Sequence, residues 1–228
     1  MKLKQRLLVL AALGVIGSVV AYGTRVHLQT GRDRAHLVRD ELDDAWHSGD
    51  YARAADLFNE LQTIEPGNPD IYVDQAFVLH SLGRDDACLD AYARGMQAVP
   101  QAWYLPFHRG YQFHYRWHND PVRALEDLDR AAGLVQIPAD TVLVLRQKAN
   151  LHAVLEQWDA LRATSERILA IDPSNRFARR DLDRVDLRVA WERRDRAQSE
   201  ALIARLRAAD PSDKVAADYA QRLDEGMQ

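Results

Sequence analysis

The chain has 228 residues, of which 47% are hydrophobic and 28% are charged, and these ordinary globular values exclude a disordered protein. Residues 1–32 hold five basic residues and no acid, so the rest of the chain has 25 Lys and Arg against 34 Asp and Glu, a net charge of −9. A domain this acidic is poorly suited to nucleic-acid binding, which needs Lys and Arg to neutralise phosphates. Only 11 Gly and 8 Pro occur, which favours an all-helical chain.

The N-terminus has the pattern of a membrane or export segment. Three basic residues within the first six precede an uncharged apolar run, Leu7 to Thr24. This run has 18 residues, close to the ~20 that a helix needs to span a bilayer and longer than the usual core of a signal peptide. We expect a single transmembrane helix within residues 1–30, with the chain from Gly31 onward outside the cytoplasm. A cleaved signal, ending at the small residues Val19 to Ala21, and a buried helix are the alternatives.

Residues 35–68 contain a pattern that later segments repeat. Two stretches with apolar residues at helical spacing are separated by Gly49-Asp50 and closed by Pro66, which predicts a helix-turn-helix unit. A second unit, residues 69–102, has the same markers at the same spacing. Each of the following lies 34 residues after its counterpart: Gly83 after Gly49, Cys88 after Ala54, Tyr92 after Phe58, and Pro100 after Pro66.

Three more segments carry the pattern with altered spacing. We expect repeats at about residues 103–138, 142–175 and 180–213, followed by a capping helix at 213–225. Ala124 follows Cys88 by 36 residues, so the third repeat has a small insertion, which we place near Pro100 to Pro106. In the fourth repeat Trp158 takes the place of Tyr51.

The helix pair with a Gly in its turn and a closing Pro resembles the tetratricopeptide repeat family. The resemblance covers roughly residues 35–211 and implies an all-α, right-handed superhelical solenoid that occupies residues 31–228. One departure is Leu42, which stands where the family has a small residue early in the first helix. The resemblance also implies a protein-binding role without a cofactor. The sequence has no Gly-rich phosphate loop, nucleophile elbow or set of clustered metal ligands, so we expect no enzyme activity.

In such arrays the first helix of each pair lines a concave surface, which is where partners bind. Applied to this sequence, that rule predicts a groove rich in aromatic residues with a basic far end. Its residues are Trp46, His47, Phe77, His80, Phe113, Trp117, Arg146, Asn150, Arg184, Arg188 and Trp191. The alternative for each aromatic residue is packing between neighbouring helices.

Arg146 and Asn150 resemble the pair with which some members of the family bind a C-terminal carboxylate. The matching place in the next repeat is Val185, so the rest of such a clamp is missing. We therefore interpret both residues as ordinary polar residues of the groove. The single cysteine, Cys88, lies on an apolar helix face and is expected to be a small buried core residue.

A metal or haem site is the least favoured alternative. His108, His114 and His118 lie in the third repeat, and imidazoles four residues apart on a helix can share an ion. No Glu accompanies them as in a His-Glu-x-x-His motif, and the surrounding residues are aromatic, so half-buried histidines are the simpler interpretation.

Together these features predict a membrane-anchored bacterial tetratricopeptide repeat protein. Its expected role is a non-catalytic scaffold that recruits another protein or peptide into an envelope complex. The expected location is the inner membrane, with a single span at residues 7–24 and the repeats in the periplasm; release into the periplasm after signal cleavage is the alternative. A fixed structural subunit of a larger membrane complex is the second hypothesis, and a metal- or haem-handling accessory protein is the third.

Overall fold

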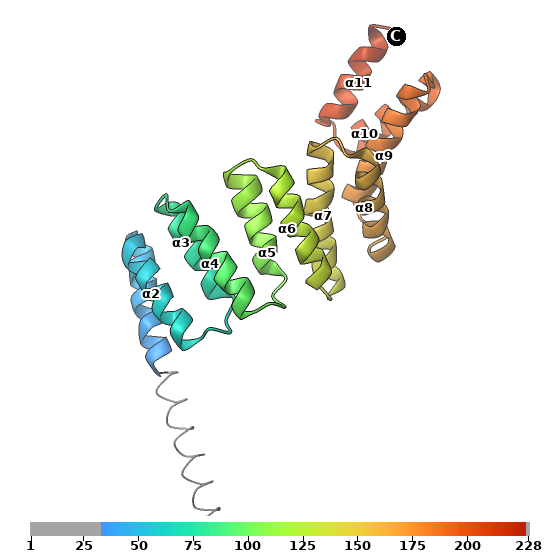
Figure 1. Cartoon of the computed structure of the whole chain (residues 1–228). Coiled ribbons are helices and arrows are strands. Elements are labelled where there is room, and N and C mark those ends of the chain that lie inside the picture. Colours follow the sequence, from blue (N-terminus) through green and yellow to red (C-terminus); the bar gives the residue numbers. More distant parts are fainter. Residues whose placement is uncertain (1–32, 227–228) are drawn as a thin grey trace, which may run out of the picture. The chain divides into compact units, whose positions relative to one another are not determined.

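A computed structural model describes residues 33–226, and this part of the chain is helical and contains no strand (Figure 1). Of these residues, those up to Pro100 form one compact unit and those from Gln101 form a second. The predicted membrane segment, residues 7–24, lies outside the described residues. Within residues 33–226 no helix is both long and apolar enough to cross a membrane.

The first unit contains two helix pairs. A helix over residues 33–48 pairs with α2 (Tyr51–Ile64), and α3 (Asp70–Ser81) pairs with α4 (Asp85–Ala98). Helix α3 packs against both α2 and α4. The small residues Ala54 and Cys88 are fully buried, as the pattern predicted, because the paired helices cross closely there. Tyr92, in the aromatic position, is buried as well.

Each turn between paired helices contains one residue with a left-handed backbone. In the first two repeats this residue is Gly49 or Gly83, with φ of 76° and 69°, a conformation that glycine adopts at little cost. In the later repeats Asn119, Glu156 and Arg194 take φ of 50°, 55° and 56° at the same place. The turn geometry is therefore kept in every repeat, although its glycine marks only the first two.

The second unit continues the series of helix pairs and ends with a single helix (Figure 1). Its helices are α5 (Tyr104–His108), η1 (Arg109–Trp117), α6 (Pro121–Leu134), α7 (Pro138–Val154), α8 (Trp158–Ile171), α9 (Arg176–Glu192), α10 (Arg196–Ala209) and α11 (Lys214–Asp224). Trp158 begins α8 as Tyr51 begins α2, which confirms that the two residues are equivalent. Helix α11 lies where a capping helix is expected, and it ends the unit with Ala216 and Leu223 buried in a core shared with α9 and α10.

The insertion of the third repeat lies inside its first helix. Trp103 precedes α5 and follows its counterpart Pro69 by 34 residues, whereas Asp120 precedes α6 and follows Arg84 by 36. The two extra residues therefore fall between Trp103 and Asp120, and the prediction that placed them near Pro100 to Pro106 is wrong. The helix absorbs them as a π-helix, η1, in which each turn holds more residues than an α-helix does.

A close contact between helices η1 and α6 needs the glycine of the third repeat. A Cβ atom on Gly110 would lie 2.8 Å from the carbonyl oxygen of Ala124 and 2.8 Å from the Cβ of Asp127. Gly110 follows the fully buried Ala76 of α3 by 34 residues, so both occupy the early position of the first helix where the family has a small residue. In the first repeat the larger Leu42 is accommodated and is buried.

The first helices of the last two repeats begin earlier than predicted. Helix α7 begins at Pro138, which suits the first turn of a helix because its ring presets φ and it has no N–H to lose. Helix α9 begins at Arg176, and the Asn175 side chain accepts a hydrogen bond from the Ala178 N–H at 3.2 Å. The predicted starts at 142 and 180 miss the first turn of each helix, and part of the candidate site lies in the first turn of α9.

Candidate functional site

In the first unit, two predicted groove residues from different repeats form an aromatic pair. The rings of Trp46 and Phe77 stack with centroids 5.7 Å apart and planes 23° apart. Phe77 is 41% exposed and Trp46 is half-buried. His47 is exposed, with Nδ1 2.7 Å from the Asp43 carbonyl oxygen. The two aromatic residues thus form a partly exposed surface in the first unit.

His80 lies at the turn between α3 and α4. Its Nδ1 is 2.8 Å from a carboxylate oxygen of Asp85, the first residue of α4. An equivalent side-chain contact occurs in the fourth repeat, where Nδ1 of His152 is 2.8 Å from Oε1 of Gln157. Because these contacts join the two helices of one repeat, we interpret His80 as a residue of the turn.

In the third repeat, the predicted groove residues pack against each other. Phe113 is only 4% exposed, and the half-buried Trp117 meets it edge-on with ring centroids 6.1 Å apart. His118 lies over the same phenyl ring, with centroids 4.3 Å apart. Phe113 therefore offers little surface to a ligand.

Three predicted groove residues come together in the second unit. Arg146 and Asn150 of α7 and Arg184 of α9 line one cleft of about 320 Å³, which we call the α7–α9 cleft. Its complete lining is Tyr111, Arg146, Gln147, Asn150, Ala153, Ile168, Phe177, Ala178, Arg180, Asp181 and Arg184. This lining combines an apolar floor with three guanidinium groups, two amides and one carboxylate. Guanidinium and amide donors above an apolar floor suit the binding of a polar or anionic group.

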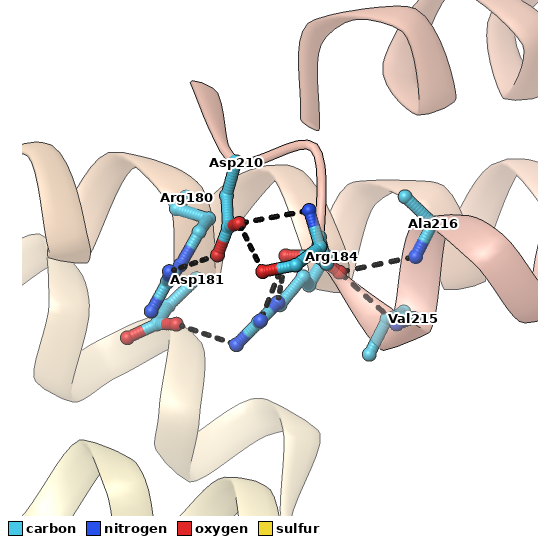
Figure 2. A network of polar contacts seen from close by, with 8 residues as sticks. Arg180, Asp181, Arg184, Asp210, Val215 and Ala216 are labelled. Atoms are coloured by element: carbon cyan, nitrogen blue, oxygen red, sulfur yellow. Dashed lines mark hydrogen bonds and ion pairs between the residues drawn. The ribbon is translucent and has the colours of Figure 1, made fainter. Parts of the chain in front are cut away.

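Two of the three arginines are held by aspartates of the segment between α10 and α11 (Figure 2). Arg184 donates from Nε and Nη2 to one carboxylate oxygen of Asp213, at 3.0 and 2.7 Å, and from Nη1 to Asp181 at 3.4 Å. Arg180 donates to Asp210 at 3.2 Å. Such charge-assisted hydrogen bonds fix the guanidinium groups in place, so both arginines form rigid walls of the cleft.

The carboxylate of Asp213 also begins the capping helix. Its other oxygen accepts hydrogen bonds from the N–H groups of Val215 and Ala216, both at 3.0 Å (Figure 2). The Asp213 side chain is 0% exposed. One buried carboxylate therefore connects the start of α11 with a wall of the α7–α9 cleft.

Phe177 is surrounded by guanidinium groups. The Cζ atoms of Arg146, Arg176 and Arg180 lie 4.3, 4.9 and 5.5 Å from the centre of its ring, distances at which cation–π attraction operates. Within residues 33–226, Arg146 has no carboxylate within ion-pair distance. Burial raises the pKa of Asp181, and the positive charge of Arg184 opposes that increase.

The last two predicted groove residues lie outside this cleft. The Arg188 guanidinium is 5.1 Å from the centre of the Trp158 ring and lines a second cleft, of about 560 Å³, together with Trp158 and Glu192. Trp191 packs edge-on against Tyr219 of α11, with centroids 5.1 Å apart, beside the core that α9, α10 and α11 share. Trp191 thus stabilises the capping helix.

The three histidines of the third repeat have separate surroundings. His114 is buried, with Nε2 3.6 Å from Asp127, and burial lowers its pKa. His108 lies edge-on against Phe107, whereas His118 lies on Phe113. Within residues 33–226 these three histidines do not form a set of ligand atoms close enough for one metal ion. His108, His114 and His118 therefore do not form one common metal site among the described residues.

Among the cleft residues that the sequence did not assign, Phe177 precedes the predicted start of the fifth repeat at residue 180, whereas Arg180 and Asp181 lie at that start. The signal for the true start of α9 is Asp172-Pro173-Ser174-Asn175, in which Asn175 is a good N-cap directly before Arg176. Val185 is buried, as a core residue would be, so the amide position of a carboxylate clamp is absent from α9.

Comparison with known proteins supports the same class of protein. Residues 45–105 match the family model described as tetratricopeptide repeat. No curated protein matches the chain. A tetratricopeptide repeat protein from Parabacteroides merdae has a similar solved structure, with a TM-score of 0.61, 15% identity, and coverage of 84% of this chain and 74% of that one.

Two further solved structures are similar at lower scores. One is PilF of Pseudomonas aeruginosa, with a TM-score of 0.50 and 14% identity over 84% of this chain and 99% of that one. The other is MamA, with a TM-score of 0.50 and 12% identity over 81% of this chain and 96% of that one. At these identities the likeness concerns the fold alone.

The described residues form an all-helical array of repeats, and residues 45–105 match the tetratricopeptide repeat model. The fold is that of tetratricopeptide repeat proteins, a class that in general binds other proteins.

Proposed function

We propose that this protein is a non-catalytic scaffold that binds a segment of a partner protein in the α7–α9 cleft. The observation that carries the proposal is the convergence of Arg146 and Asn150 from α7 with Phe177 and Arg184 from α9 in one cleft. Aromatic and arginine side chains in a concave site are typical of the residues that dominate the binding free energy of protein interfaces.

Site-specific photo-crosslinking tests this proposal. A photoreactive phenylalanine analogue in place of Tyr111, whose side chain lines the cleft, is expected to trap one partner protein in intact cells. The matched control is position 166, an exposed glutamate of α8 that does not line the cleft. Loss of the adduct in a Phe177→Ala variant would assign it to the cleft, whereas equal adducts from positions 111 and 166 would contradict the proposal.

We also propose that the scaffold is tethered to the bacterial inner membrane with its repeats in the periplasm, where it recruits a component of an envelope complex. Support comes from the charge pattern of the N-terminus, with basic residues before the apolar run at residues 7–24. Membranes washed with alkaline carbonate should retain the full chain, and added protease should digest the repeats only after the outer membrane is opened. Complete release by carbonate would contradict the tether.

A further inference from the structure

The three arginines of the α7–α9 cleft differ in the ion pairs and hydrogen bonds that they already make within the protein. Arg184 uses both sides of its guanidinium group on Asp213 and Asp181, and Arg180 is paired with Asp210. Arg146, by contrast, lies over the face of Phe177 and has no carboxylate within ion-pair distance among the described residues, although it interacts with the charge of Asp181 at longer range. It is therefore the arginine of this cleft that can accept a new anionic partner without giving up an ion pair.

The groups next to Arg146 suit one carboxylate. Asn150 lies one helical turn further along α7 and Gln147 is adjacent to Arg146 in sequence, so all three border the cleft from the same helix. Neither amide side chain makes a hydrogen bond to another described residue, and Asn150 is exposed. A guanidinium group beside an amide N–H₂ group can hold both oxygens of a carboxylate.

The remaining lining fits the stem of an acidic side chain. The Phe177 ring, Ala153 and Ile168 provide apolar contact for methylene groups. The lining has three positive charges and one negative charge, on Asp181, so it is a positive site in a chain whose residues 33–228 are acidic. Electrostatic complementarity of this kind favours an acidic segment over a neutral or basic one.

Two observations separate this ligand from related ones. A phosphate group usually binds a cluster of several available arginines, whereas here one is available and Asp181 lies nearby. A chain-terminal carboxylate clamp needs a second amide on the next repeat, where this protein has the buried Val185.

We propose that the α7–α9 cleft binds the side-chain carboxylate of an Asp or Glu within an extended, internal acidic segment of a protein partner, with Arg146 and Asn150 as its main contacts. This inference rests on the proposed scaffold function and adds the chemical class of the ligand. Arg180 and Arg184 contribute the positive potential while they stay paired with Asp210 and Asp213.

The test uses the full chain and fluorescent peptides of alternating Glu and Val, acetylated at the N-terminus and amidated at the C-terminus, in an anisotropy titration. The Glu peptide should bind, and its Gln isostere should bind roughly tenfold more weakly or less, since hydrogen bonds to charged groups are worth about 1.5–3 kcal/mol. Arg146→Gln should reduce affinity for the Glu peptide by about the same factor. Arg167→Gln is the matched control, because this exposed arginine of α8 removes the same charge away from the cleft.

Several outcomes would overturn the ligand class. They are equal binding of the Glu and Gln peptides, equal losses for Arg146→Gln and Arg167→Gln, tighter binding of a phosphoserine peptide, and binding that requires a free C-terminal carboxylate. Circular dichroism checks that each variant folds, and Asn150→Leu provides a second test at the same contact.

Photo-crosslinking separates the two proposals. If position 111 traps a partner that excess Glu peptide does not displace, the acidic ligand is wrong and the scaffold stands. If position 111 traps nothing and no peptide binds, both are contradicted.

Discussion

The sharpest stability prediction concerns Asp213→Ala. The carboxylate is fully buried, caps α11 through two N–H groups and accepts two hydrogen bonds from Arg184. Loss of an N-cap costs about 1 kcal/mol, and loss of a hydrogen-bonded charge partner costs a further ~2 kcal/mol, so we expect α11 to be destabilised by about 3 kcal/mol. Helix α11 is the last element of the second unit, so the loss should appear as local opening of that helix.

Amide hydrogen exchange measured by mass spectrometry checks this expectation. Exchange in residues 214–224 should become roughly 100-fold faster in Asp213→Ala, since every 1.4 kcal/mol is a factor of ten. Asp213→Asn should have a smaller effect, because the amide oxygen can still cap the helix. The control is Asp224→Ala, which removes the same charge from the exposed end of α11. If Asp213→Ala and Asp224→Ala exchange alike, the carboxylate does not hold the capping helix.

Four further predictions follow from burial and charge. Gly110→Ala should lower the free energy of unfolding, measured with urea, by about 1–3 kcal/mol, because the added Cβ would collide with the Ala124 carbonyl oxygen and the Asp127 Cβ. Gly133→Ala is the control: no atom lies within 4 Å of its Cβ, so it should raise the free energy of unfolding by up to ~1 kcal/mol. Burial raises the pKa of Cys88 to about 12, so its thiol should resist a disulfide reagent in the folded protein. Because the unfolded chain loses the thiol proton first, the free energy of unfolding should fall as pH rises from the ordinary thiol value of ~8.5 toward about 12. Burial lowers the pKa of His114, so its neutral form favours the folded state; stability should fall as pH drops below ~6.5, and His114→Phe should remove part of that slope. Asp181→Asn removes the negative charge of the cleft and should raise affinity for the Glu peptide about threefold in the anisotropy titration.

Each of these predictions has a contrary result. Similar urea midpoints for the two glycine variants would show that η1 and α6 can separate at little cost. Rapid modification of Cys88 under native conditions would mean that the first unit opens readily. An unchanged acid transition in His114→Phe would assign the acid sensitivity to other groups, and an unchanged affinity in Asp181→Asn would place the peptide elsewhere.

The repeat class could be predicted because its signals are local. Gly49 and Gly83 mark turns that need a left-handed backbone, and Ala54 and Cys88 mark helix crossings that need a small side chain. The π-helix could not be predicted in the same way, because its hydrogen-bond register depends on how η1 fits against α6 at Gly110 rather than on a hydrophobic period.

For the candidate site, repeat spacing brought three of the predicted polar residues together and did not do so for the aromatic ones. Arg146, Asn150 and Arg184 were placed on a common surface by repeat spacing, and they do line one cleft. Phe113 and Trp191 were assigned to the same groove, but Phe113 is buried and Trp191 packs against Tyr219. A large aromatic residue at a groove position can also turn toward the neighbouring helix, and spacing alone does not distinguish the two orientations.

The sequence by itself determined that the chain is a series of helix pairs closed by a capping helix, because helical periodicity, turn glycines and closing prolines act over a few residues. Only the tertiary structure decided which arginine of the cleft is available. Asp210 and Asp213 lie about one repeat beyond Arg180 and Arg184, and their pairing follows from the packing of α9 against α10 and α11. Ion pairs of this kind depend on distances between residues far apart in the chain, and the packed helices alone set those distances.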